Sequence, residues 1–146
     1  MNARNFLKQP KKLDKIIENK LAEKEQWKAI ASGITAQMNG ERVQSSGSQQ
    51  KMADAIGRYI DIEEEINAII DKLIDTKKDV INVIEQLNVY EYDILHKVYV
   101  QDFTLQQVAY MYDKSIGWAK NIHKKGLRNV QRILDEREGA TQSDLL

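Results

Sequence analysis

Amide and cationic side chains gather near residue 120 at the spacing of one helical face. The group consists of Lys120, Asn121, Lys124, Lys125 and Arg128. An asparagine amide can pair with adenine through two hydrogen bonds, and a lysine can donate to guanine acceptors or to phosphate. The same stripe also suits an ordinary solvated helix face. These residue types therefore indicate contact with a polyanion only if the neighbouring elements present this face to one.

Groups suited to catalysis are scarce. The chain has no cysteine, and its two histidines, His96 and His123, have no partner at metal-ligand spacing. Residues 61–65 are mostly acidic, but neighbouring residues on a helix point in different directions, so the run predicts a solvated face. Residues 45–48, Ser-Ser-Gly-Ser, lack the ending of a phosphate-binding loop. We expect no enzyme activity, no metal and no cofactor, with His123 at the surface.

The balanced net charge conceals a partition along the chain. Residues 1–28 hold eight basic and four acidic side chains, and residues 51–87 hold five and nine. Residues 88–134 hold seven basic and four acidic side chains, and residues 135–146 hold one and four. The locally positive segment at 88–134 can therefore bind an anionic partner although the total is zero.

The expected location follows from what is missing near the start and along the chain. Residues 1–6 contain no apolar run that could act as a signal peptide. No apolar stretch approaches the roughly 18 residues of a membrane helix. The absence of cysteine fits a reducing compartment. We expect a cytoplasmic protein in a bacterial host, without membrane contact.

The first periodic segment predicts a helix. Apolar residues recur at three- and four-residue steps from Leu13 to Met38. Pro10 precedes them, where proline can open a helix, and Asn39-Gly40 follows, where glycine commonly ends one. The polar residues 40–50 then predict a mobile loop.

The second periodic segment is longer. From Ile62 to Leu87, apolar residues follow an alternating four-three spacing for more than three heptads. A helix over residues 51–87 would be about 55 Å long. We expect residues 1–87 to form a coiled-coil-like antiparallel hairpin. Its apolar stripes would be covered in a homodimer or, alternatively, by the rest of the chain.

Capping patterns divide residues 88–134 into short helices. The N-cap candidates are Asn88 with Glu91, Thr104 with Gln107, and Ser115. Each pair places a capping side chain three residues before its reciprocal partner. Only three or four residues separate the last two helices, which is the span of a helix-turn-helix. The last helix is predicted over 115–134, followed by an acidic tail at 135–146.

In this order of helices, residues 88–134 resemble region 4 of bacterial sigma factors. Residues 91–99 resemble the first helix of that module, residues 104–109 its positioning helix, and residues 115–130 its recognition helix. The resemblance implies an all-α fold, a hairpin followed by a three-helix helix-turn-helix. It also implies binding to double-stranded DNA, with RNA polymerase as a further candidate partner.

A helix-turn-helix inserts the first turns of its last helix into the major groove, while the preceding helix crosses the backbone. The candidate DNA-binding residues are therefore Thr104, Gln106, Gln107, Ser115, Ile116, Gly117, Trp118, Lys120, Asn121, Lys124, Lys125 and Arg128. Residues 116–118 are unusually apolar for this place and suit either thymine methyl groups or a protein surface. For Trp118, internal packing and partner contact are both open. The tyrosines from Tyr90 to Tyr112 are expected to pack.

The whole chain is similar to a family of small proteins encoded by phages and prophages of Gram-positive bacteria. The similarity includes the loop at 43–48 that leads to Lys51-Met52-Ala53-Asp54. The C-terminal end resembles the ArpU- and RinA-type phage regulators of transcription. Our hypothesis is a DNA-binding transcriptional regulator. The alternatives are a non-catalytic protein that binds RNA polymerase or another protein without reading DNA, and a phage packaging component.

Overall fold

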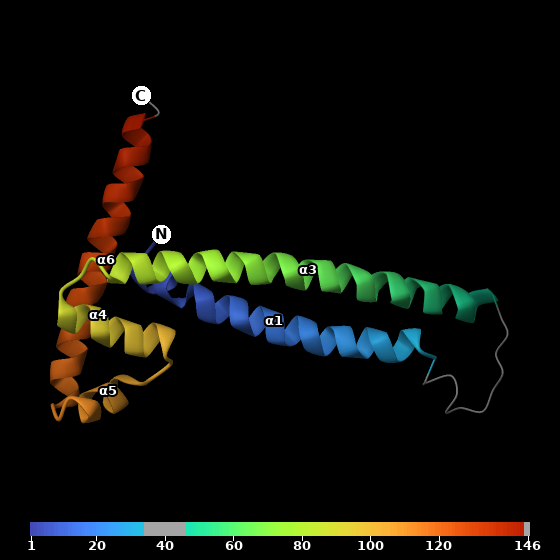
Figure 1. The fold of residues 1–146 in the computed structure, drawn as a ribbon, viewed down its shortest axis with the longest axis horizontal. Helices are drawn as coiled ribbons and strands as arrows, with labels where there is room; N and C mark the ends of the chain where they lie inside the picture. The colour runs from blue at the N-terminus through green and yellow to red at the C-terminus, as the bar shows by residue number, and fades with distance from the viewer. Residues whose placement is uncertain (34–45, 145–146) are drawn as a thin grey trace. The chain divides into compact units, whose positions relative to one another are not determined.

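The computed structural model describes residues 1–33 and 46–144, and within these ranges it contains helices and no strand (Figure 1). Its elements are α1 (Ala3–Ala31), α3 (Ser46–Ile84), α4 (Val89–Leu95), the π-helix η1 (His96–Val100), α5 (Leu105–Met111) and α6 (Ile116–Asp144). The predicted all-α class, with a helix-turn-helix in the C-terminal part, is confirmed. In the part of the chain described, no helix is both long and apolar enough to span a membrane.

The chain divides into two compact units. The terminal unit contains Met1–Lys11 and Asp75–Leu146, and the hairpin unit contains Lys12–Ile74. The sequence predicts the boundary between the hairpin and the helix-turn-helix at residue 87, and this division differs from it. The difference arises because the first turns of α1 and the last turns of α3 share an apolar core with α6.

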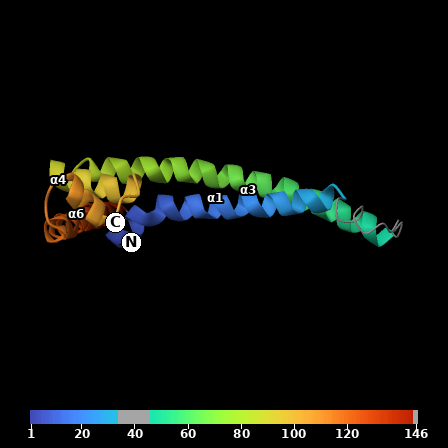
Figure 2. The same cartoon turned by 90° about the horizontal axis from the view of Figure 1, so that it is seen from below.

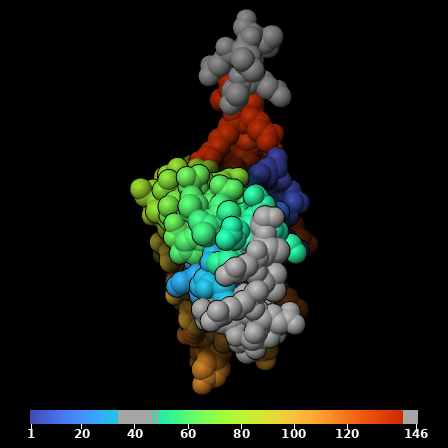
Figure 3. Space-filling view, turned by 90° about the vertical axis from the view of Figure 1, so that its right-hand side faces the viewer, coloured from blue at the N-terminus to red at the C-terminus, as the bar shows by residue number. Residues whose placement is uncertain are grey.

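In the hairpin unit, α1 and α3 run antiparallel and lie side by side (Figures 1 and 2). Their surfaces adjoin in the space-filling view (Figure 3). The apolar core is narrow. Its buried hydrophobic residues, within the described ranges, are Leu13, Ala55, Ile62 and Ile66.

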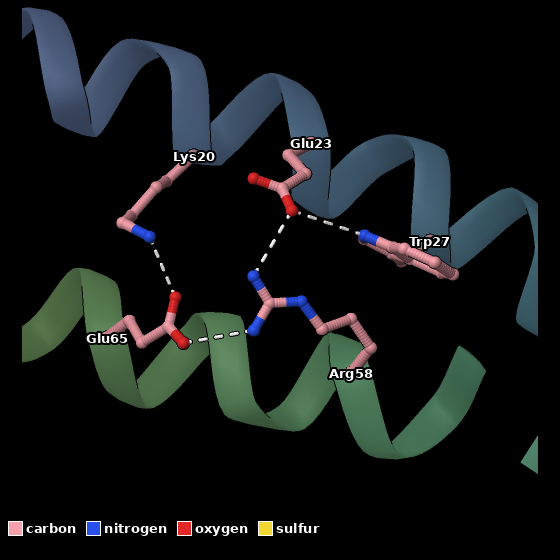
Figure 4. A network of polar contacts seen from close by, with 5 residues as sticks. All are labelled: Lys20, Glu23, Trp27, Arg58 and Glu65. Carbon is pink, nitrogen blue, oxygen red and sulfur yellow. Dashed lines mark hydrogen bonds and ion pairs between the residues drawn. The ribbon is translucent and has the colours of Figure 1, made fainter. Parts of the chain in front are cut away.

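A polar network joins the same two helices beside that core (Figure 4). The Arg58 guanidinium donates to Glu65 at 3.0 Å and to Glu23 at 3.2 Å, and Lys20 donates to Glu65 at 2.8 Å. The indole of Trp27 lies 3.5 Å from the same Glu23 carboxylate. Hydrogen bonds from Lys20 and Arg58 lower the pKa of Glu65. The hairpin therefore joins its helices by charge as well as by burial.

The limits of α1 differ from the predicted ones. The helix begins at Ala3, so that Pro10 lies inside it rather than before it. An internal proline costs about 3 kcal/mol. The apolar residues ahead of it, Phe6 and Leu7, are buried, and each contributes about 1.5–3 kcal/mol, which offsets that cost. The helix ends at Ala31, and Gly33 follows with a φ of 71°. The predicted end of the helix at residues 39–40 lies outside the described residues.

Two further boundaries differ. Helix α3 begins at Ser46, within the segment predicted as a loop at 40–50, and the rest of that loop lies outside the described residues. Helix α6 continues to Asp144 instead of ending near residue 134. Arg137, in this continuation, forms an ion pair with Asp79 of α3 at 2.9 Å.

The core of the terminal unit draws on both ends of the chain. Its buried members are Ala3, Phe6, Leu7, Val80, Val83, Ile84, Leu95, Val130 and Leu134. Polar contacts join the same segments. The backbone N–H of Ala3 donates to Gln131 at 2.7 Å, and the Gln131 amide donates to the carbonyl of Met1 at 3.2 Å. The start of α1 is thus an integral part of the body that carries the helix-turn-helix.

Candidate nucleic-acid interface

The predicted caps define the three helices of the module. The Asn88 side chain accepts from the backbone N–H of Glu91 at 2.9 Å. Thr104 and Gln107 form a complete capping box at the start of α5. The Ser115 hydroxyl accepts from the N–H of Trp118 at 3.2 Å. Since each cap satisfies backbone donors that a helix leaves open, the local sequence determines where these helices begin.

Helix α6 makes a close approach to α4 at Gly126. A Cβ at this position would lie 3.0 Å from a methyl carbon of Leu95, so a side chain here would have to displace that leucine by a few tenths of an ångström. Beside it, the buried carboxylate of Glu91 accepts from the amide of Asn129. These contacts orient α6. A glycine within an amphipathic helix is the sequence signal by which such an approach could be found.

An aromatic cluster holds the first turns of α6. The Trp118 ring packs against Tyr112 at 5.0 Å and against Tyr90 at 6.3 Å between centroids. Trp118 is half-buried in this cluster. The Tyr112 hydroxyl donates to Asp93, which also pairs with Lys97 at 2.6 Å.

The hydrogen bond between Tyr112 and Asp93, together with burial, shifts the pKa values of both groups. Burial and the Asp93 hydrogen bond raise the pKa of Tyr112 to about 12. Burial opposes ionisation of Asp93, but the hydrogen bonds from Lys97 and Tyr112 outweigh it and lower the pKa of that carboxyl. The bond between Tyr112 and Asp93 therefore persists at neutral pH and fixes the turn between α5 and α6. Sequence reasoning missed this pair, because its members are 19 residues apart.

The opposite side of α6 is open. All of the predicted contact residues on this helix other than Trp118 are exposed, and so are the capping Ser115 and the α5 side chains. Within the described ranges, the side chains of five of these residues make no hydrogen bond or ion pair: Lys120, Asn121, Lys124, Lys125 and Arg128. Four cations and one amide thus lie together on one helix face without an internal partner.

The α5 residues have a divided role. Gln107 uses its amide oxygen to accept from the N–H of Thr104, at 2.8 Å, which leaves its NH₂ group able to donate outward. Gln106 is exposed beside them. Together with Tyr110 and Met111 these residues line an open pocket of about 470 Å³.

Two of the sequence expectations are wrong. His123 is buried, with 9% of its surface exposed, and it stacks on Tyr99 with an Nε2 to hydroxyl distance of 2.8 Å. It lies on the inner face of α6, three residues before Gly126. Tyr110, expected to pack, is 87% exposed. Burial, with the nearby Arg4 cation, lowers the pKa of His123, and burial raises the pKa of Tyr99.

Residues 83–132 match the family model described as "Sigma-70, region 4". The C-terminal part of the chain is thus a sigma region 4-like helix-turn-helix. The match begins at the end of α3 and contains all of the predicted contact residues. Searches of curated proteins and of solved structures found no significant match.

The match covers about a third of the chain, 50 of 146 residues, from 83 to 132. It supports the resemblance to sigma region 4 that the residues indicate. It stops short of two parts of the terminal unit, the start of α1 and the last turns of α6. The sigma region 4-like module is therefore enlarged here by additional packed segments.

Proposed function

We propose that the protein is a transcriptional regulator that binds double-stranded DNA through the sigma region 4-like module. The observation that supports it best is the exposed, internally unpartnered set of donors on the outer face of α6. A helix-turn-helix presents this part of its last helix to the major groove. Capping, the aromatic cluster and the Gly126 contact hold the helix in place.

The residues divide by their role at the DNA. Lys120 and Asn121, in the second turn of α6, would contact base edges. Lys124, Lys125 and Arg128 lie farther along and would contact phosphates. The earlier residues Ile116 and Gly117 would allow an apolar contact with a thymine methyl and a close backbone approach.

Helix α5 would contact the DNA backbone. Thr104, Gln106 and Gln107 are exposed at its first turn, and the free NH₂ of Gln107 is a donor suited to a phosphate oxygen. The capping box keeps this donor in a defined position. The contact would fix the register of the module without reading sequence.

The wider setting of the proposal follows from the resemblance of the whole chain to phage and prophage proteins. We place the regulator in the cytoplasm of a bacterial host, with RNA polymerase as a candidate partner. It would act as a homodimer through the hairpin, because several large apolar side chains of the hairpin unit are exposed. They include Leu21, Ile30, Ile56, Ile60, Ile70 and Ile74.

Binding of the full chain to fragments of its neighbouring genome, at low and near-physiological salt, tests the proposal. We expect one fragment to stay bound at the higher salt. Asn121→Ala and Lys120→Ala should weaken this specific binding by roughly 5- to 150-fold, which corresponds to about 1–3 kcal/mol. Arg128→Ala should weaken binding to all fragments and flatten the salt dependence.

Lys72→Ala, an exposed lysine of the hairpin unit, is the matched control and should leave binding unchanged. Equal and weak binding of specific and random duplexes by wild type and variants would contradict base reading. Loss of binding in the Lys72 variant would instead place the contact outside the module.

A second function is supported by the apolar surface beside the cationic face. Tyr110, Met111 and Ile116 are all exposed there. In this version the module binds RNA polymerase or another protein without touching DNA. A duplex footprint centred on α6 would exclude it. The third candidate, a phage packaging component, requires an assembly larger than a dimer, which light scattering would detect.

A further inference from the structure

One flank of α3 in the hairpin unit carries exposed isoleucines in a single line, here called the Ile stripe. The exposed fractions are 47% for Ile56, 48% for Ile60, 38% for Ile70 and 47% for Ile74. With 3.6 residues per turn, these four positions stay within about 40° of one direction. The buried Ile62 points about 120° away from that direction. The stripe is thus separate from the face that packs on α1.

The spacing of the stripe reads the same in both directions. Successive members are four, ten and four residues apart, so the pattern is symmetric about position 65. Two copies of α3 placed antiparallel around a two-fold axis at this position would pair Ile56 with Ile74 of the second copy. The same axis would pair Ile60 with Ile70 of the second copy. A two-fold interface requires this kind of self-complementary surface.

The polar residues within the stripe favour the antiparallel direction. Glu63 and Asn67 lie between Ile60 and Ile70 on the same face of the helix. In a parallel pair the two Glu63 carboxylates would face each other, which is unfavourable. In the antiparallel pair each carboxylate would face an Asn67 amide, which can donate to it. Lys24 of the same chain, 3.0 Å from Glu63, also reduces the local negative charge.

We infer that a second copy of this chain covers the Ile stripe in an antiparallel register centred on position 65. The inference rests on the homodimer of the proposed function and names its surface and direction. Four isoleucines per chain make a small patch, in the class of interfaces that bury less than about 1,200 Å² in total. The dimer is therefore expected to be concentration-dependent.

Disulfide trapping in the full chain tests the register, because the natural sequence has no cysteine. Ile60→Cys and Ile70→Cys are made separately, and one of them carries a tag that marks it by mass. We expect a cross-linked dimer only when the two are mixed. Like positions would be about 15 Å apart along the helices, whereas a disulfide needs Cα atoms within about 7 Å. Self-linking of either variant to the same extent would overturn the register.

Sedimentation equilibrium adds a charge test. Ile60→Glu should raise the dimer dissociation constant by on the order of tenfold or more, because it buries a carboxylate opposite an isoleucine. Ile60→Glu combined with Ile70→Lys should recover association, since the register brings the new opposite charges together. In a parallel pair like charges would meet, and association would stay lost. Ala68→Glu, at an exposed position of α3 about 120° away from the stripe, is the control and should leave association unchanged.

The outcomes separate the two proposals. A wild-type chain that remains monomeric at all concentrations overturns the homodimer and its register, and the DNA-binding measurement still stands by itself. A dimer that is insensitive to the stripe substitutions overturns the register alone. Circular dichroism of each variant verifies that the exposed substitutions leave the helices folded.

Discussion

The two units hold α1 and α3 together by different means. In the terminal unit, Leu7, Val83 and Ile84 are fully buried in a core that includes residues of α6. In the hairpin unit, the fully buried Ile62 belongs to a narrow core, and a charged network around Arg58 lies beside it. The same pair of helices thus depends on packing across distant segments at one end and on packing with charge at the other. Variants in each unit can test this difference.

The largest effects are expected from truncating a buried side chain in either core. Leu7→Ala and Ile62→Ala each remove a side chain with no exposed surface, which costs about 2–5 kcal/mol of the free energy of unfolding. Urea unfolding followed by circular dichroism measures the loss. Hydrogen exchange then locates it, with Leu7→Ala lowering amide protection in α4, α5 and α6, and Ile62→Ala lowering it in the hairpin unit.

The exposed Leu21, also a leucine of α1, provides the control. Leu21→Ala should change the free energy of unfolding by less than about 0.5 kcal/mol. If Leu7→Ala and Ile62→Ala reduced protection equally throughout the chain, the division into two units would not describe its stability.

The sequence predicts local features of the terminal unit better than its closure. Caps at Asn88, Thr104 and Ser115 depend on residues within three positions of each other, and all three form. The burial of Phe6 against residues from α6 joins segments more than a hundred positions apart. Periodicity shows that a face is apolar, but not which distant face covers it.

The same limit explains the errors at the candidate site. His123 is polar, and the helical repeat alone allows its side chain to lie on either the buried or the exposed face of α6. Its burial became possible because Tyr99 supplies both a stacking partner and a hydrogen-bonding hydroxyl. Tyr110 shows the converse, since an aromatic residue at helical spacing predicts packing and yet lies 87% exposed on α5.

Acid should affect His123 of the terminal unit and Glu65 of the hairpin unit in different pH ranges. The folded-state pKa of His123 is below the ordinary value of 6.5, so the unfolded chain binds its proton first as the pH falls. Its contribution to stability is therefore complete above pH 6.5 and declines below it. The pKa of Glu65 in the hairpin unit is lowered from an ordinary value of 4.5. The contribution of this carboxylate to the free energy of unfolding is therefore lost only below that pH.

Urea unfolding between about pH 7.5 and about pH 5 measures the first range. We expect the free energy of unfolding to fall in the wild type and the slope to be reduced in His123→Phe, which keeps an aromatic ring beside Tyr99. A slope that is unchanged in this variant would assign the acid sensitivity to other groups.

The smallest effect is expected from the charged network of the hairpin. Arg58→Ala removes two contacts, to Glu23 and Glu65, and should lower the melting temperature slightly at low salt. The difference from the wild type should shrink at 1 M salt, where the screening length is about 3 Å. Lys15→Ala, which removes an exposed pair with Glu18 within α1, is the matched control and should have no measurable effect. A salt-independent loss in Arg58→Ala would mean that burial of the aliphatic part of the arginine provides the stabilisation instead of its charge.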